Sequence, residues 1–554
     1  METNSKQINE PCVMEEEIIT QNIIVSMTVF CGNPNFRVAW KTRNGVGYIL
    51  ANGKVLENNY KYKNEVLPNA DGLVELLAVG DAILERLDCS NQHISLLDVS
   101  KCTGLKVLHC ADNALPSLDV TACVELVELN CSLSAVSSLD VTKCVKLKKL
   151  NCQRNNLSFL DISKCTKLRE IDCYNNSLFS LDISRCVKLR KINCSKNLLT
   201  ALDVSLCVES RKIHCNDNKL SSLDLTKCME LTELECDDNK LSSLDMTQCA
   251  KLQKITCHRN NLSSLDVAQC VKLREINCYS NKLSYLDVSR CAELREIYCH
   301  YNNLSSLDVS RSVELRKIYC QKNNLSVLDI TGCVKLRKLK CQNNQLSSLD
   351  ASKCTKLERL FCSENQLQIL EVSPDARLIY LWCGDNKLTS LDVRKRTRLR
   401  GLCCDNNQLS FLDISKSTEM HQLCCSHNQL SSLNVAHCSN LDDLNCSNNK
   451  ISSLYMTDWS ELRQLDCSSN QLSELDLSSC EQLWLLNCSA NQLSSLDVTS
   501  CDCLLMLNCS SNRLSALDVT NCVELNSLDY SQNNIDEVDI SNCPELPVAE
   551  ENHI

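Results

Sequence analysis

The chain has 554 residues, a formal net charge of -11, and only 10 glycines, 7 prolines and 4% aromatic residues. So few glycines and prolines exclude a string of domains joined by flexible linkers, and 44% hydrophobic residues exclude a largely disordered chain. The negative charge argues against a nucleic-acid partner held through its phosphates. The outlying number is 43 cysteines, in a chain far too long to be a small disulfide-stapled scaffold.

The amino-terminal part of the sequence differs from the rest. Residues 1–22 are expected to form a disordered or loosely ordered tail, and the glutamates scattered through it do not suit a secretory signal peptide. Residues 23–83 contain short apolar runs, such as 23–30, 36–41 and 47–56, separated by turn residues. This pattern predicts a small antiparallel β-rich domain that caps whatever follows it.

Beyond residue 83 the cysteines follow a repeat. A first series keeps a 21-residue period from Cys89 to Cys509 without a gap, and a second series, with the same period, has cysteine in most slots from Cys102 to Cys543. One copy, residues 273–293, reads LREINCYSNKLSYLDVSRCAE, and its first half fits the leucine-rich repeat template L-x-x-L-x-L-x-x-N-x-L. The repeats predict a leucine-rich repeat solenoid of about 22 copies over residues 84–545, followed by a tail at 546–554.

One copy indicates how the solenoid is built. Alternation predicts a short strand in which Ile276 and Cys278 face inward and Asn277 faces outward. Stacked copies would pair these strands into a parallel sheet at about 4.8 Å spacing, on the concave face of a horseshoe or arc. The remaining half of each copy forms the opposite wall, and it is too short for an average helix, so extended or 3₁₀ segments are expected there.

Two polar slots recur in nearly every copy. Asparagine stands three positions after the first cysteine in 20 of 22 copies and is expected to satisfy backbone groups where the strand ends. Aspartate fills a later slot in 19 of 22 copies, from Asp98 to Asp539, with serine or threonine usually two positions on. Local hydrogen bonding would hold these carboxylates; a calcium stripe is the alternative, with few oxygens per copy to support it.

These motifs resemble a known family. The 21-residue period, the phrase L-x-x-L-x-C-x-x-N-x-L-x-x-L-D-V-[ST] and one inward cysteine per copy are similar to the internalin J type of leucine-rich repeat protein, in which stacked thiols form a cysteine ladder. The resemblance covers more than four-fifths of the chain. It implies a right-handed arc, an adhesive role at a bacterial surface and a secreted or cell-surface location, whereas the sequence itself suggests a cytoplasmic chain.

The cysteines in the two series are expected to be buried free thiols with raised pKa, and neither a cofactor nor a metal is required; a zinc or iron–sulfur array is the alternative. Cys403 and Cys424 lie outside both series, at the same slot of adjacent strands, and face outward. They are a candidate surface dithiol that could oxidise or hold a metal with Asp405. The alternative is that they are two tolerated surface cysteines.

The outward slot before each first-series cysteine is polar from Asp88 to Asn277 and then changes character on seven adjacent strands. The seven side chains there are Tyr298, Tyr319, Lys340, Phe361, Trp382, Cys403 and Cys424. Neighbouring slots add three more rings, so the candidate ligand-binding surface, called the aromatic strip below, comprises Tyr279, Tyr298, His300, Tyr319, Lys340, Phe361, Tyr380 and Trp382. Over seven strands such a surface is about 30 Å long.

The aromatic strip leads to a functional hypothesis. In a solenoid, function resides on variable outward slots, and aromatic side chains are favoured at the centres of interfaces, so a protein or peptide ligand is expected. The opposite wall is irregular over the same span, at Glu371, Pro374, Asp375, Arg396 and Ser417. Alternatives are a carbohydrate ligand, rings that merely pack on one another, and a purely structural scaffold.

Other functions have little support in the sequence. It contains no motif of a metalloprotease, phosphate loop or nucleophile elbow, so an enzyme is not expected, and no stretch is long and apolar enough to span a membrane. The oligomeric state stays open, because the end after Pro544 is too short to be a good cap and could pair with a second copy.

Overall fold

The computed structural model describes residues 84–454 and 459–546 in full, together with the backbone of Tyr455 and of six strands between residues 23 and 79. Every regular element in the described part of the chain is a strand. Contacts divide the chain into two compact units, residues 1–270 and 271–554. The predicted tails, residues 1–22 and most of 546–554, lie outside the described residues, and the predicted domain limits stay predictions.

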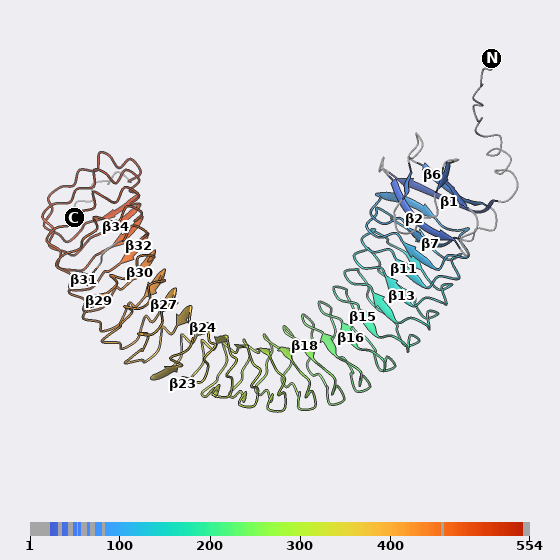
Figure 1. Cartoon of the computed structure of the whole chain (residues 1–554), viewed down its shortest axis with the longest axis horizontal. Helices are drawn as coiled ribbons and strands as arrows, with labels where there is room; N and C mark the ends of the chain where they lie inside the picture. The colour runs from blue at the N-terminus through green and yellow to red at the C-terminus, as the bar shows by residue number, and fades with distance from the viewer. Residues whose placement is uncertain are drawn as a thin grey trace, which may run out of the picture. The chain divides into compact units, whose positions relative to one another are not determined.

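In the first unit, parallel strands follow one another at 21-residue intervals (Figure 1). The strands are β7 (Leu84–Asp88), β9 (Val107–His109), β11 (Glu128–Asn130), β13 (Lys149–Asn151), β14 (Glu170–Asp172), β15 (Lys191–Asn193), β16 (Lys212–His214), β17 (Glu233–Glu235) and β18 (Lys254–Thr256). Short strands of the opposite wall are β8 (Ile94–Asp98), β10 (Leu118–Asp119) and β12 (Leu139–Asp140). The outward side of the parallel sheet is called the sheet face below.

The amino-terminal strands are antiparallel, as expected. They are β1 (Ile23–Cys31), β2 (Phe36–Thr42), β3 (Tyr48–Ala51), β4 (Lys54–Leu56), β5 (Asn64–Val66) and β6 (Leu73–Val79). Strand β2 pairs with β7 at the edge of the parallel sheet, and β1 pairs with β8 on the opposite wall. Both walls of the first coil thus gain a strand partner, which removes the open edges that would otherwise invite another chain to pair there.

The second unit repeats the same arrangement, from β19 to β35 (Figure 1). Its parallel strands are β19 (Glu275–Asn277), β20 (Glu296–Tyr298), β21 (Lys317–Tyr319), β22 (Lys338–Lys340), β24 (Arg359–Phe361), β26 (Tyr380–Trp382), β27 (Gly401–Cys403), β28 (Gln422–Cys424), β30 (Asp443–Asn445), β32 (Gln464–Asp466), β33 (Leu485–Asn487), β34 (Met506–Asn508) and β35 (Ser527–Asp529). The opposite wall carries β23 (Ser348–Ala351), β25 (Ile369–Val372), β29 (Leu433–Asn434) and β31 (Leu454–Tyr455).

Each coil encloses a thin apolar core. In residues 273–293 the strand ends at Asn277, just before the predicted position, while Ile276 and Cys278 are fully buried as expected. The buried side chains of this coil are Leu273, Ile276, Cys278, Leu283, Leu286, Val288 and Cys291. On the opposite wall the chain is extended and then makes two consecutive turns, closed by hydrogen bonds from the amides of Cys291 and Leu294 to the carbonyls of Val288 and Cys291.

The recurring asparagine joins each coil to the one before it. The side-chain amide of Asn302 donates to the carbonyls of Cys299 in its own coil and of Cys278 in the preceding coil, both at 3.0 Å. Its carbonyl oxygen accepts from the amide of Leu283, also at 3.0 Å. The residue before it, Tyr301, has φ 54°, a left-handed conformation found at this slot in coil after coil. The predicted role of the asparagine is confirmed.

The two cysteine series form two ladders of buried thiols. Burial raises the pKa of Cys102 to about 12 and raises the pKa of Cys110 well above its usual range. Thiols of the second series also donate weak hydrogen bonds to the preceding coil, as from Cys144 Sγ to the carbonyls of Val120 at 3.6 Å and Cys123 at 3.7 Å. The cysteines therefore fill the core as small apolar side chains.

The aspartate row is held by local hydrogen bonds. Asp308 accepts from the amide of Ser310 at 3.0 Å and from its hydroxyl at 2.7 Å. These bonds lower the pKa of Asp308. The same pair of bonds recurs at Asp497 and Thr499. Each carboxylate is thus stabilised within its own turn, in agreement with the expectation from the sequence.

We predict that Asn302→Ala destabilises its coil by roughly 3 kcal/mol, because buried carbonyls and the Leu283 amide would lose their partners. Hydrogen exchange at Leu283 should accelerate about 100-fold. The matched control is Asn303→Ala, since the Asn303 side chain is exposed and only its backbone amide is bonded. Equal effects of the two substitutions would contradict the role given to Asn302.

We also predict steep loss of stability above pH 9. Each ladder thiol stays protonated when folded but ionises near pH 9 when unfolded, so its stabilisation is complete below pH 9 and is lost as the pH rises toward about 12. Each thiol removes about 1.4 kcal/mol per pH unit in that window. Circular dichroism and thiolate absorbance should change together between pH 9 and 11; a fold that stays intact at pH 11 would contradict this.

Candidate functional site

The core of the aromatic strip is a single row across five neighbouring strands of the second unit. Tyr298 on β20 is paired in register with Tyr319 on β21, and the row continues through Lys340, Phe361 and Trp382. All five are the last residues of their strands, where side chains point away from the core. The structure therefore places these predicted residues on one face.

At the first end of the strip the rings contact one another. Tyr279 stacks on His300, with ring centroids 4.5 Å apart and planes at 13°. Tyr298 meets Tyr319 edge-to-face at 5.0 Å. His300 lies 6.4 Å from Tyr319, which links the two pairs. These are favourable aromatic geometries, so the rings hold one another in place without closing over the surface.

Lys340 connects the two halves of the strip. Its ammonium nitrogen is 5.0 Å from the ring centroid of Tyr319 and 5.6 Å from that of Phe361. Phe361 in turn meets Trp382 edge-to-face at 4.7 Å. Phe361 is only 9% exposed, whereas Trp382 is 41% exposed. Trp382 is thus the ring that is open to a partner, and Phe361 supports it.

Tyr380 reaches the strip because of a glycine that the sequence pattern did not single out. A Cβ atom at Gly401, on the next strand, would lie 2.8 Å from the Tyr380 ring. Glycine therefore leaves the space that this ring occupies, and Arg359 stacks on the same ring at 5.5 Å. Gly384 serves a different purpose: the Asp405 carboxylate occupies the space beside it.

Hydrogen bonds fix Tyr298. Its hydroxyl donates to Glu296, whose carboxylate is also 3.0 Å from Lys317. Burial disfavours the charge on Glu296, but the bonds from Tyr298 and Lys317 outweigh burial and lower the pKa of Glu296. Burial and the neighbouring carboxylate raise the pKa of Tyr298. The phenol therefore stays a neutral donor at neutral pH.

A shallow groove of about 600 Å³ runs beside the strip over β20–β24. Its lining is mostly cationic, with two carboxylates: Glu296, Arg316, Lys317, Tyr319, Arg337, Lys338, Glu358 and Arg359. The groove is shallow and open, which suits a segment of another chain more than an enclosed small molecule.

Cys403 and Cys424 extend the row by two strands. They are paired in register and half-buried, so both are reachable from solvent. A hydrogen bond between the two thiols raises the pKa of Cys403 and lowers the pKa of Cys424. Asp405 carries its charge nearby, and burial raises the pKa of this carboxyl. A dithiol is in place; its oxidation and metal binding stay predictions.

We predict that Cys403 and Cys424 react with a maleimide before the ladder cysteines in the folded protein, because the ladder thiols are buried. Cys503 is also half-buried and serves as an internal control for an unpaired thiol. Peptide mapping by mass spectrometry gives the rates residue by residue. Labelling of Cys404 and Cys425 at the rate of their neighbours would contradict the arrangement.

The irregular opposite wall has a packing explanation. Ser373 and Ala376 turn inward while Pro374 and Asp375 stay exposed. Arg396, which replaces a ladder cysteine, is 5% exposed, and its guanidinium donates to the carbonyls of Val372, Ser373 and Pro374 at 2.7–3.1 Å. The buried arginine thus closes a distorted turn. These substitutions give no independent support for binding.

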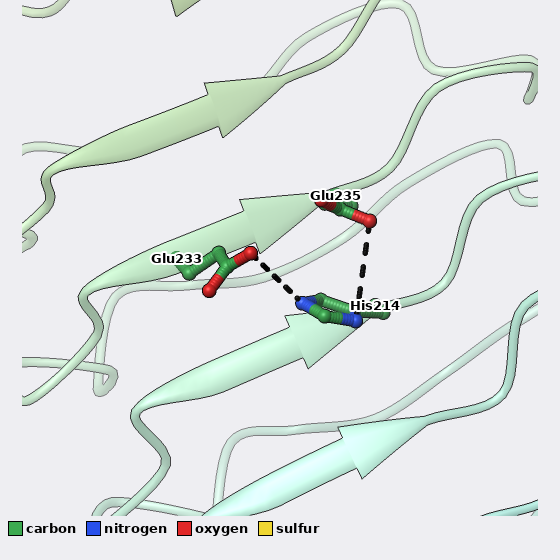
Figure 2. A group of neighbouring side chains, drawn as sticks. All are labelled: His214, Glu233 and Glu235. Carbon is green, nitrogen blue, oxygen red and sulfur yellow. Dashed lines mark ion pairs between the residues drawn. The ribbon is translucent and has the colours of Figure 1, made fainter. Parts of the chain in front are cut away.

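Two histidine–carboxylate clusters on the sheet face of the first unit were missed by the sequence analysis. His214 lies between Glu233, at 3.5 Å from Nε2, and Glu235, at 3.9 Å from Nδ1 (Figure 2). The second cluster is Asp237, Asp238 and His258. In each cluster the histidine and the carboxylates come from adjacent coils, so they are too far apart in the sequence to form a local motif that would reveal them.

The carboxylates of the first cluster already have cationic partners. Lys212 pairs with Glu233 at 2.5 Å, and Lys254 pairs with Glu235 at 2.7 Å. A metal ion would have to displace both ammonium groups, and the two ring nitrogens of His214 face different carboxylates (Figure 2). The cluster is therefore a charge-balanced network of the sheet face.

The comparisons with known proteins agree with this architecture. The family model "Leucine Rich repeats (2 copies)" matches residues 334–374, and no curated protein matches the chain. The functional domain of InlJ from Listeria monocytogenes, described as including a cysteine ladder, is 28% identical over 70% of this chain and 72% of that one, with a TM-score of 0.46.

Two further solved structures share the fold. YopM from Yersinia enterocolitica is 24% identical, covers 84% of this chain and 90% of its own, and has a TM-score of 0.59. The Arabidopsis receptor kinase HAESA, solved with the peptide hormone IDA and the co-receptor SERK1, is 20% identical over 82% of this chain and 87% of that one, with a TM-score of 0.60.

The described coils therefore have the leucine-rich repeat fold. With 21-residue coils and a buried cysteine at every first-series slot from Cys89 to Cys509, the chain resembles the internalin J type of leucine-rich repeat protein, as the sequence indicated. Among the described residues there is no helix that could cross a membrane.

Proposed function

We propose that the chain is a non-catalytic interaction module that binds a peptide segment of a protein partner at the aromatic strip. The observation that carries the proposal is the register of Tyr298, Tyr319, Lys340, Phe361 and Trp382 on one face. Elsewhere in this row the residues are chiefly asparagine and aspartate. A purely structural scaffold would not need this change from polar to mainly aromatic side chains.

The contacts within the strip support a preformed surface. Rings that already contact one another lose little freedom when a partner docks, so less of the binding free energy is spent on ordering them. Aromatic residues are also the types that most often dominate interface energetics. HAESA, which shares the fold, was solved with a peptide hormone, and this favours a peptide ligand by analogy only.

The compartment is part of the proposal. The described cysteines are free, and almost all are buried in ladders. Such a fold suits a reducing compartment, in which an unfolded chain would not form mispaired disulfides before it folds. We therefore propose that the chain works inside a cell; the alternative is the extracellular surface role of internalins.

We predict that Tyr319→Ala with Trp382→Ala weakens peptide binding roughly 100-fold, because the first removes a half-buried ring that contacts Tyr298 and the second removes the exposed ring of the strip. The probe is a pool of random 12-residue peptides displayed on phage and selected on the whole chain. Recovery of the selected pool by the double variant, compared with the parent, is the measurement.

The matched control is Tyr285→Ala with Phe411→Ala. Both rings are highly exposed, at 60% and 64%, and lie in the half of the coil away from the sheet face of the same unit. This variant should bind the pool as the parent does, and thermal melting should be alike for both double variants. A selected pool that ignores the loss of Tyr319 and Trp382 would refute the proposed function.

A further inference from the structure

Three cations of the aromatic strip and its groove have no carboxylate partner. Lys338 and Lys340 on β22 and Arg359 on β24 form no ion pair among the described residues. Their charged groups rest on rings instead, Lys338 and Lys340 at 5.1 and 5.0 Å from Tyr319 and Arg359 at 5.5 Å from Tyr380. Positive charge is therefore held in place on the surface without being neutralised.

The cations of the strip contrast with three lysines on the sheet face of the first unit. These lysines pair with glutamates on neighbouring strands, in Lys191–Glu170, Lys212–Glu233 and Lys254–Glu235. At the edge of the strip Lys317 pairs with Glu296 in the same way. The chain as a whole has a net charge of -11. A local cluster of unpaired cations in such a chain is unexpected unless a partner supplies the negative charge.

The cationic region is also short. From β20 to β26 there are four steps between strands, about 19 Å, which an extended peptide spans with about six residues. Acidic side chains lie on both sides of it on the same sheet: Glu275 on β19, the strand next to β20, and Asp443 and Asp466 on β30 and β32, the third and fourth strands beyond β26. A long polyanion such as a nucleic acid would meet these carboxylates, whereas a short acidic segment would not.

We propose that the partner segment is an acidic peptide stretch whose carboxylates pair with Lys338, Lys340 and Arg359 while an apolar side chain packs on Trp382. This inference rests on the proposed function and adds the chemistry of the partner. The ring contacts hold the cations in position and partly desolvate them, so a carboxylate can pair with each at little ordering cost. Arginine can in addition grip a carboxylate with two parallel hydrogen bonds.

The test compares three forms of the whole chain with the same random 12-residue phage library. The first is the parent, the second carries Lys338→Glu, Lys340→Glu and Arg359→Glu, and the third carries Lys353→Glu, Lys395→Glu and Lys416→Glu. The third is the matched control, because its three exposed lysines lie on the opposite wall of the same unit and the net charge changes equally. Circular dichroism checks that all three are folded.

Peptides selected on the parent should be enriched in aspartate and glutamate. The best one, synthesised, should bind the strip variant roughly 100-fold more weakly and the wall variant within about twofold of the parent. Its affinity for the parent should fall as the salt concentration rises.

Each other outcome overturns the inference. Selected peptides without acidic enrichment, or equal binding to the strip variant, would refute the acidic partner while leaving the proposed function intact, provided binding still needs Tyr319 and Trp382. Displacement of the peptide by a 12-nucleotide oligothymidylate would assign the site to nucleic acid. If the selected peptides bind equally well when Tyr319 and Trp382 are both replaced by alanine, the proposed function itself is refuted.

Discussion

Fixed register between coils is the constraint on which this structure depends. Every coil has the same length, and its asparagine bonds both to its own turn and to the coil before it, as Asn302 does with Cys299 and Cys278. A coil of another length would leave buried carbonyls without donors. Because register is fixed, each slot forms a row, and substitution within a row changes a surface without changing the fold.

The cysteine content follows from the same constraint. The two ladder positions of each coil lie in its thin, closely packed core, where a small apolar side chain fits. Where the second series departs from cysteine, the replacement is accommodated locally. Ser417 donates its hydroxyl to the Arg396 carbonyl, and Arg396 closes the turn of the preceding coil. Since Ser417 and Arg396 both fit at second-series positions, these positions require a side chain that packs into the turn and not the reactivity of a thiol.

Much of the fold could be predicted because the same 21-residue pattern of apolar, cysteine and asparagine positions recurs in about 22 copies. Ile276 and Cys278 are buried, the asparagines bond as expected, and the core of the aromatic strip lies in one row. Backbone conformation was harder to predict: the left-handed residue before each asparagine is variously aspartate, lysine or tyrosine, so no glycine reveals it. Tyr301 at φ 54° shows that tertiary register overrides local preference.

Details of the site were beyond sequence reasoning for a related reason. Contacts such as Lys340 with Tyr319 and Phe361, or His214 with Glu233, join residues of neighbouring coils, and their geometry depends on side-chain conformations that a pattern does not specify. The exposure of Trp382 beside the nearly buried Phe361 has the same origin. Sequence identified the row, and structure distinguished the residues that can meet a partner from those that support them.

The central claim is that the aromatic residues in an otherwise polar row mark the binding surface. Hydroxyl-radical footprinting of the whole chain, with and without a saturating selected peptide, tests it most directly, because oxidation reports each side chain separately. The account predicts protection of Tyr319, Tyr380 and Trp382 and unchanged oxidation of Tyr285 and Phe411. Protection on the opposite wall or on the sheet face of the first unit, with Trp382 unaffected, would contradict it.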